Sequence, residues 1–115
     1  MHEYSIVSAL VDNVQAALDP HPGAVVRRLY VQIGEQAGVE IELLRTAFET
    51  FRDRSICARA ELEIHPVAAV WACVGCGRTI EPGAVLRCPA CGRPARLVAG
   101  GEIILERIEM EVPDV

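Results

Sequence analysis

The segment CVGCGRTIEPGAVLRCPACGR, residues 73–93, carries the strongest pattern in this chain of 115 residues. It contains two Cys-x2-Cys pairs, Cys73 with Cys76 and Cys88 with Cys91, and eleven residues separate the pairs. A glycine follows each pair, and glycine allows a turn with positive φ that points backbone amides at the sulfur atoms. Two such knuckles supply four thiolates, a set that suits Zn²⁺ and is typical of closed structural sites. The segment therefore predicts a structural zinc site.

Two other chemistries also use clustered cysteines. A redox-active dithiol needs one pair in a βαβ context, whereas this segment has two pairs and no such context. An iron site of the rubredoxin type uses the same four ligands, so the spacing alone leaves the metal open. The fifth cysteine, Cys57, lies outside the segment. We expect it to be a small buried hydrophobic residue, because free cysteine is among the most buried residue types.

On both sides of this segment, apolar residues recur with helix or strand periodicity. Ser5 fits the N-cap of the first helix, and Pro66 is expected to close the second strand. An extended run resumes after Gly101 and most simply pairs back into the first sheet. The predicted elements are helices over residues 5–18 and 40–52, and strands over residues 25–33, 60–65, 67–72 and 102–112.

This order of elements predicts an α+β fold, in which a small domain of two helices and a three-stranded sheet is interrupted by a four-cysteine module resembling a zinc ribbon. We expect residues 1–66 and 102–115 to form the first domain and residues 67–101 to form the inserted module. The linkers are expected near Pro66 and Gly101, where the composition changes.

The composition excludes several classes of protein. Hydrophobic residues make up 51% of the chain, which excludes a disordered protein. With eleven arginines, no lysine, few aromatic residues and a net charge of -5, the chain is poorly suited to hold a phosphate backbone. We therefore expect no nucleic-acid partner. The module nevertheless contains four arginines and one acid: Arg78, Arg87, Arg93 and Arg96, with Glu81. These arginines could contact phosphate. The favoured interpretation is a solvated face or a face that docks a protein.

The N-terminal sequence and the hydropathy pattern indicate a compartment. Residues 1–5 lack the basic region and cleavage site of a secretory signal. No stretch approaches the roughly 18 apolar residues that a membrane span needs. We therefore expect a cytoplasmic protein without a membrane partner, in which thiols stay reduced and clustered cysteines bind metal.

The sequence Met1-His2-Glu3 has two interpretations. A histidine at position two is usually part of a frayed terminus. Alternatively, an α-amine and an imidazole lose their protons near pH 8 and about 6.5, so both can bind metal close to neutrality. Together with the backbone nitrogens between them they can surround a metal in a plane, which suits Ni(II) or Cu(II) better than Zn(II). His21, in a proline-rich turn, and His65, at a strand end, are expected to be structural or solvent-exposed.

Taken together, these motifs resemble the HypA/HybF family, whose members are nickel metallochaperones for the maturation of [NiFe]-hydrogenase. The resemblance covers nearly the whole chain, and the combination of motifs is specific although each motif alone is not. The residues that carry it are Met1-His2-Glu3, Ser5 opening a helix, Val31-Gln32-Ile33-Gly34-Glu35, Gly38-Val39, Ala47-Phe48-Glu49, Ala60-Glu61-Leu62-Glu63-Ile64, both cysteine knuckles and Glu102-Ile103-Ile104-Leu105.

The resemblance implies a non-enzymatic carrier. Ni(II), the transferred cargo, would be bound by the Met1 amine, the His2 imidazole and the backbone nitrogens of His2 and Glu3, while the Glu3 carboxylate would orient His2. The four cysteines would hold structural Zn(II). The implied partners are a HypB-type GTPase and the precursor of the hydrogenase large subunit. Some family members also serve urease. The sequence leaves open whether the protein forms a homodimer.

Two departures from the family bear on the zinc site. The spacing of eleven residues between the knuckles is somewhat short, and no histidine lies next to either knuckle. A fixed four-cysteine site is therefore expected, without exchange of a cysteine ligand for histidine. The alternative function is a zinc-ribbon module that binds protein or nucleic acid and delivers no metal. Salt-dependent binding to DNA or RNA would favour that alternative.

Overall fold

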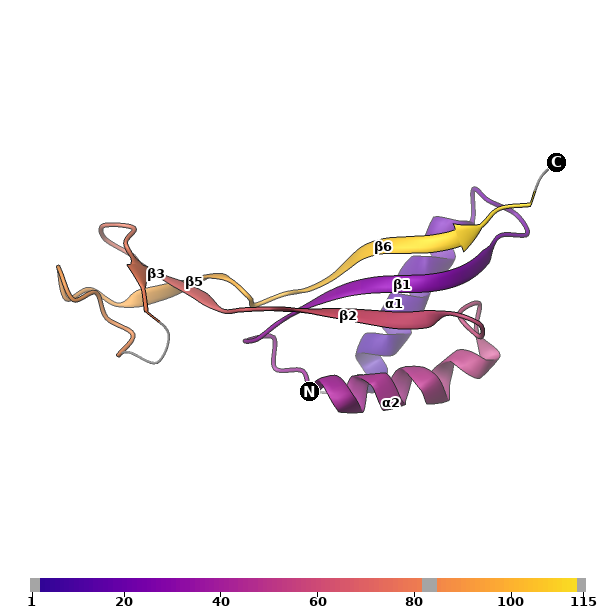
Figure 1. The fold of residues 1–115 in the computed structure, drawn as a ribbon, viewed down its shortest axis with the longest axis horizontal. Coiled ribbons are helices and arrows are strands. Elements are labelled where there is room, and N and C mark those ends of the chain that lie inside the picture. The colour runs from indigo at the N-terminus through magenta and orange to yellow at the C-terminus, as the bar shows by residue number, and fades with distance from the viewer. Residues whose placement is uncertain (1–2, 82–84, 114–115) are drawn as a thin grey trace.

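A computed structural model describes residues 3–81 and 85–113 of the chain. The protein is elongated, with extents of 61 × 29 × 16 Å and a radius of gyration of 18.2 Å, against about 13 Å for a compact chain of this length. Two three-stranded sheets lie one after the other along the longest axis (Figure 1). The elements are α1 (Glu3–Leu18), β1 (Val25–Gly34), α2 (Ile41–Phe51), the 3-10 helix η1 (Arg52–Arg54), β2 (Glu61–Val67), β3 (Val70–Cys73), β4 (Thr79–Ile80), β5 (Ala95–Ala99) and β6 (Ile103–Glu111).

The larger unit, called the body below, consists of α1, α2, η1 and the sheet β2-β1-β6. The central strand β1 runs parallel to β2 and antiparallel to β6. Both helices cover one face of this sheet (Figure 1), and the hydrophobic core lies between the helices and the sheet. No helix within the described ranges is long and apolar enough to cross a membrane. The return of β6 to β1 after the cysteine segment confirms the predicted pairing and the α+β class.

Alternation along β1 explains why the core forms on one face only. Leu29, Val31 and Ile33 are buried, whereas Arg28 and Tyr30 lie on the opposite, open face of the sheet. Burying one such aliphatic side chain contributes about 1.5–3 kcal/mol. A shift of the register by one residue would turn all three to the open face. The sequence pattern of β1 therefore fixes the side on which the helices pack.

The smaller unit, called the ribbon below, spans residues 70–99 and contains the sheet β4-β3-β5. Both pairings of β3 in this sheet are antiparallel. Its described core consists of Cys73, Ile80 and Cys88, with Trp71 and Ala95 packed against it. Two of the three fully packed residues are thus candidate metal ligands, so the ribbon has little apolar core of its own.

A waist of closely packed backbone joins the two units. A Cβ atom on Gly34 would overlap the carbonyl group of Gly100, and Gly100 itself has a φ of +87°. Directly after Gly34, the backbone N–H of Glu35 donates to the carbonyl of Val67 at 2.8 Å, and the Glu35 carboxylate accepts from the N–H of Ala69 at 2.8 Å. Both chain crossings between body and ribbon are therefore held against the end of β1.

The boundaries of three predicted elements are corrected. Helix α1 begins at Glu3, so Ser5 lies inside the first turn and is not the N-cap. Strand β2 continues through Pro66 to Val67, and the proline is tolerated because β2 is an edge strand of its sheet, where a missing N–H costs no ladder bond. The strand predicted over residues 67–72 is interrupted, and β3 begins only at Val70.

Candidate metal centre

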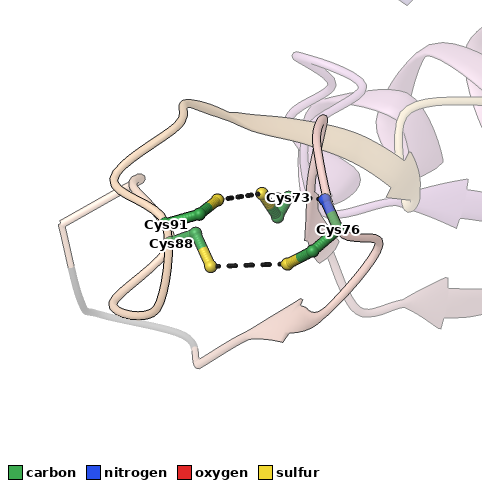
Figure 2. Close-up of side chains that lie close together, drawn as sticks. All are labelled: Cys73, Cys76, Cys88 and Cys91. Carbon is green, nitrogen blue, oxygen red and sulfur yellow. Dashed lines mark hydrogen bonds between the residues drawn. The ribbon is translucent and has the colours of Figure 1, made fainter.

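The four cysteines of the two knuckles lie together in the ribbon. The first pair begins at Cys73, the last residue of β3, and the second pair lies before β5; Figure 2 shows the four side chains facing one another. One ligand atom from each cysteine can be chosen so that all four lie within 4.8 Å of one another. The Sγ atoms of Cys73 and Cys91 are 3.3 Å apart, and those of Cys76 and Cys88 are 3.7 Å apart. Each knuckle thus faces the other across a space bounded by four sulfur atoms.

These distances fit a tetrathiolate metal site. Four sulfurs at about 2.3 Å from a central Zn²⁺ form a tetrahedron whose edges measure about 3.8 Å. The observed separations approach that edge and far exceed the S–S bond length of about 2 Å. All five cysteines of the chain are free thiols. The donor set and its geometry are therefore positioned for zinc, and an iron ion would accept the same ligands.

The two knuckles repeat one backbone pattern. Gly77 and Gly92 have φ values of +75° and +73°, as their place after each pair predicts. The N–H of Gly77 donates to the carbonyl of Cys73 at 3.1 Å, and the N–H of Gly92 donates to the carbonyl of Cys88 at 2.8 Å. The turn therefore bends each second cysteine back over the first, so that two equivalent knuckles supply the four sulfurs.

Backbone amides prepare the first cysteine of each pair to act as a thiolate. The N–H groups of Gly75 and Cys76 lie 3.3 Å and 3.5 Å from the Sγ of Cys73. The hydrogen bond from Cys76 is the main cause that lowers the pKa of Cys73 to about 6. The equivalent N–H of Cys91, with that of Ala90, lowers the pKa of Cys88. Because thiolates and not thiols bind zinc, this local field favours metal binding.

Cys91 has the opposite tendency in the metal-free protein. The N–H of Arg93 lowers its pKa, but the neighbouring sulfur of Cys73, burial and Cys88 together raise that pKa to about 11. Two sulfurs 3.3 Å apart repel one another when both are ionised, so ionisation of one thiol disfavours ionisation of the other. A divalent cation between the sulfurs would remove this repulsion and allow both to ionise.

The surroundings of the site are those of a structural centre at the protein surface. Cys73 and Cys88 are buried, whereas Cys76 and Cys91 are exposed. The described group of candidate ligands contains no histidine. His65 lies on the body, where its Nδ1 is 3.3 Å from the Glu106 carboxylate and its side chain is half exposed. Within the described residues, this group of candidate ligands consists of cysteines alone.

The N-terminal candidates are placed only in part. Met1 and His2 lie outside the described residues. Glu3 begins α1, and its Oε2 lies 3.5 Å from the backbone N of Glu40, which is the N-cap of α2 and makes no side-chain cap of its own. The described contact of the Glu3 carboxylate is therefore with the start of α2. Sequence reasoning missed this contact, because no local pattern links residues 37 positions apart.

Cys57 is fully buried in the core of the body, as its sequence context predicts. Burial raises the pKa of its thiol. The neutral thiol is a poor nucleophile and a poor metal ligand. Cys57 therefore acts as a packing residue and takes no part in the cluster of the ribbon.

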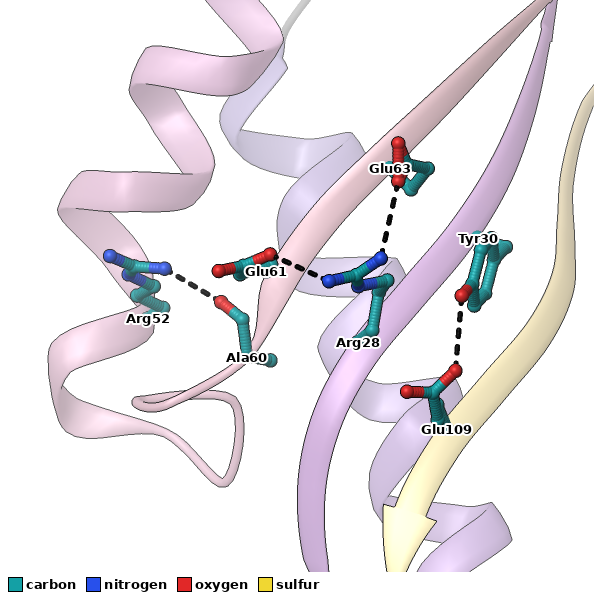
Figure 3. Close-up of polar contacts among 7 residues, drawn as sticks. All are labelled: Arg28, Tyr30, Arg52, Ala60, Glu61, Glu63 and Glu109. Atoms are coloured by element: carbon teal, nitrogen blue, oxygen red, sulfur yellow. Dashed lines mark hydrogen bonds and ion pairs between the residues drawn. The ribbon is translucent and has the colours of Figure 1, made fainter.

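The open face of the body sheet carries charged side chains that pair with one another (Figure 3). Arg28 contacts Glu61 at 3.1 Å and Glu63 at 3.8 Å. The hydroxyl of Tyr30 donates to Glu109 at 3.0 Å. These groups are exposed, so each pair contributes about 0–1 kcal/mol. The arrangement is that of a solvated sheet face rather than of a metal site.

Fold and site together define a small α+β protein with an inserted four-cysteine module positioned for zinc. Residues 1–110 match the family described as hydrogenase/urease nickel incorporation, metallochaperone, hypA. The chain belongs to this HypA family of nickel metallochaperones for hydrogenase maturation, which confirms the resemblance found in the sequence.

Individual relatives agree with this assignment over their full lengths. The hydrogenase maturation factor HypA of Wolinella succinogenes is 38% identical over 117 residues, which cover 99% of this chain and 98% of the relative. The factor of the same name from Shewanella sp. (strain MR-7) is 38% identical and covers 99% of this chain and 98% of its own. The solution structure of the Ni metallochaperone HypA from Helicobacter pylori matches with a TM-score of 0.73 at 31% identity, covering 98% of this chain and 100% of that one.

Proposed function

We propose that this protein carries Ni(II) at its N-terminus and delivers it to the large subunit of [NiFe]-hydrogenase. The Met1 amine, the His2 imidazole and the backbone nitrogens of His2 and Glu3 bind the cargo as a plane of nitrogen donors, a set suited to Ni(II). The observation that carries the proposal is that the family match begins at residue 1 and so includes these three residues. The contact of the Glu3 carboxylate with the start of α2 supports it further, because it fixes the third residue of the motif on the body.

In this proposal, Cys73, Cys76, Cys88 and Cys91 hold a structural Zn(II). The support is that their four sulfurs lie within 4.8 Å of one another and that backbone N–H groups lower the pKa of Cys73. When bound, the ion cross-links the two knuckles. Residues 67–101 then form the inserted zinc module, while residues 1–66 and 102–115 form the nickel-binding domain.

Delivery proceeds by ligand exchange while the protein is docked on a partner in the cytoplasm. An open site at a chain terminus can pass its metal from one donor to the next, which a closed cage cannot do. The proposed partners are a HypB-type GTPase, which supplies nucleotide hydrolysis, and the precursor of the hydrogenase large subunit. The protein itself acts as a carrier and not as an enzyme.

The test is a titration of Ni(II) into untagged protein beside a form that carries one extra N-terminal residue. The extra residue converts the Met1 amine into an amide, which cannot bind nickel in the same way. We expect one nickel in the untagged form, weak binding in the extended form and one zinc in both, measured by calorimetry and metal analysis. His2→Ala should abolish stoichiometric nickel binding, and His21→Ala is the matched control, since His21 is an exposed histidine elsewhere. Equal nickel affinity in the untagged and extended forms would refute the terminal site.

A further inference from the structure

The arginines of the ribbon differ from those of the body in their partners. Three of the seven body arginines form ion pairs with glutamates. Not one of the four ribbon arginines forms an ion pair with a residue in the described ranges, and the ribbon has a single acid, Glu81. The ribbon is therefore the basic end of a chain that carries a net charge of -5.

Two of these arginines lie on the cysteine knuckles. The Nη1 atom of Arg87 donates to the carbonyl of Gly92 at 3.0 Å, which fixes that side chain along the second knuckle. The side chain of Arg93 crosses to the first knuckle, because a Cβ on Gly75 would lie 2.6 Å from the Cδ of Arg93. Gly75 thus leaves room for Arg93, and the two guanidinium groups are held at the surface of the ribbon without a carboxylate partner among the described side chains.

Three exposed aliphatic residues lie on the chain segments that carry these two arginines or are bonded to them. Val74, Val85 and Leu86 are 51%, 76% and 44% exposed. Val74 is bonded to the arginine segment through its N–H, which donates to the carbonyl of Pro94 at 3.2 Å. The carbonyl of Leu86 accepts from the N–H of Ala95 at 3.0 Å. We define the knuckle patch as Val74, Val85, Leu86, Arg87 and Arg93.

Compensation of the negative charge of the proposed metal site explains only the arginines of the knuckle patch. Four thiolates and one Zn²⁺ carry a net charge of -2, and nearby guanidinium groups lower the energy of such a site. That role accounts for the arginines but gives no reason for aliphatic side chains in water beside them. Exposed aliphatic residues on the same bonded segments as arginines without a described carboxylate partner favour a surface that another molecule covers.

We propose that the knuckle patch docks an acidic segment of a partner protein. Carboxylates of that segment pair with Arg87 and Arg93, and its apolar side chains cover Val74, Val85 and Leu86. Guanidinium groups bind carboxylates in a forked geometry, which gives this contact direction as well as attraction. The patch contains none of the proposed nickel ligands, so this inference stands or fails independently of the proposed function.

A protein partner fits the patch better than a nucleic acid does. Proteins that hold single strands stack bases on aromatic side chains, and the knuckle patch has none. Trp71, the chain's single tryptophan, is half-buried and packs against the ribbon core. A phosphate backbone would also leave the three aliphatic side chains uncovered. A peptide segment that carries both carboxylates and apolar side chains can pair with the arginines and also cover the aliphatic side chains.

The experiment measures binding of labelled probes to the zinc-loaded protein by fluorescence anisotropy. The probes are an eight-residue peptide with six glutamates and two leucines, the matching peptide with eight glutamates, and a 16-base-pair DNA duplex. We expect the leucine-containing peptide to bind most tightly, and we expect its affinity to fall with rising salt because the charges are exposed. Tighter binding of the DNA duplex would replace the proposal with a nucleic-acid function. Equal binding of the two peptides, or no binding of either, would overturn it.

Variants assign the binding to the patch. The double variant R87Q/R93Q should weaken the leucine-containing peptide about tenfold, the size that two exposed charge pairs supply together. V85S should weaken it severalfold and should leave binding of the all-glutamate peptide unchanged. The matched control is R45Q, which removes an exposed arginine from the body. Metal analysis and Trp71 fluorescence verify that each variant keeps its zinc and its fold. An equal loss in R45Q would show that only net charge is sensed, and would overturn the proposal.

Discussion

The body and the ribbon are both three-stranded sheets, yet different forces hold them. The body encloses a continuous apolar core in which Phe48, Leu29 and Leu44 are fully buried. The ribbon buries Cys73, Cys88 and Ile80 as its described core. A unit of about 30 residues lies below the size at which apolar burial alone stabilises a fold. We therefore expect the same secondary structure to depend on packing in the body and on the proposed zinc ion in the ribbon.

The largest expected effect is the unfolding of the ribbon when the proposed zinc ion is removed. Structural zinc contributes about 10–16 kcal/mol in small zinc-binding peptides, and this binding energy is folding energy. A strong chelator, or Cys73→Ser, should therefore unfold the ribbon and leave the helices of the body intact. Trp71 is the single tryptophan of the chain and lies in the ribbon, so its fluorescence reports that unit. Far-ultraviolet circular dichroism reports α1 and α2.

The matched control uses the same substitution in the other unit. Cys57→Ser places a hydroxyl in the core of the body, which costs about 1–3 kcal/mol if the hydroxyl is left without a partner. It should lower the stability of the body and leave the zinc content at its original value. Loss of helical signal on chelation would contradict the division of forces between the two units.

The second prediction concerns packing in the body. Phe48 is 1% exposed, and Phe48→Ala should destabilise the body by about 3–5 kcal/mol because it removes a buried ring and leaves a cavity. Phe51 lies on the same helix at 37% exposure, so Phe51→Ala should cost much less. Urea unfolding followed by circular dichroism measures both costs. Similar costs for the two variants would mean that the core does not hold the body.

Much of the difference between the body and the ribbon can be predicted from the sequence, because local patterns define the knuckles and the buried face of β1. The two-residue spacing within each cysteine pair and the glycine after it define the knuckles without any distant contact. The alternation of β1 likewise identified its buried face. The sequence does not reveal strands β4 and β5, because strands of two and five residues in a glycine-rich segment have too little periodicity to detect. A proline predicts the end of a strand, and the sequence does not reveal that β2 lies at the edge of its sheet, where Pro66 is tolerated.

Contacts between residues far apart in the chain could not be predicted, because local sequence patterns do not show them. The contact between Glu3 and the start of α2 depends on how the two helices cross, which tertiary packing decides. The close approach of Gly34 to Gly100 joins residues that no local motif relates. The sequence shows glycine at both positions. Only the fold shows that the two backbone segments approach too closely there for a side chain.

The third prediction tests how the waist joins the two units. Gly34→Ala forces a Cβ against the Gly100 carbonyl, and overpacking of this kind costs about 1–3 kcal/mol. The ribbon should then move more independently of the body, with the two units keeping their own folds. Gly38→Ala is the control for a glycine substitution without overlap, since a Cβ on Gly38 would have nothing within 4 Å; its φ of +75°, which Gly34 does not share, means that this control carries backbone strain alone. Backbone ¹⁵N relaxation measures tumbling of each unit. Unchanged relaxation in Gly34→Ala would show that the waist does not couple them.

The smallest expected effect lies at the end of the body farthest along β6, where Arg27 Nη2 is 2.9 Å from Glu111 Oε2. The hydrogen bond from Arg27, with its charge, lowers the pKa of Glu111 below the ordinary value of 4.5. Because the folded-state pKa lies below the unfolded one, the pair stabilises the body above pH 4.5 and loses this contribution as the pH falls through the folded-state pKa. Both groups are exposed, so the contribution is small and screened by salt.

Arg27→Gln should therefore lower the melting temperature slightly at neutral pH. The difference from the original protein should vanish as the pH falls through the folded-state pKa of Glu111, and also in about 1 M salt. Arg54→Gln is the control, because Arg54 is an exposed arginine that forms no ion pair with a described residue, and it should give no pH-dependent difference. A difference for Arg27→Gln that persists at low pH would mean that the arginine stem, and not its charge, stabilises the strand end. Even this weakest contact would then belong to packing, which is the force that distinguishes the body from the ribbon.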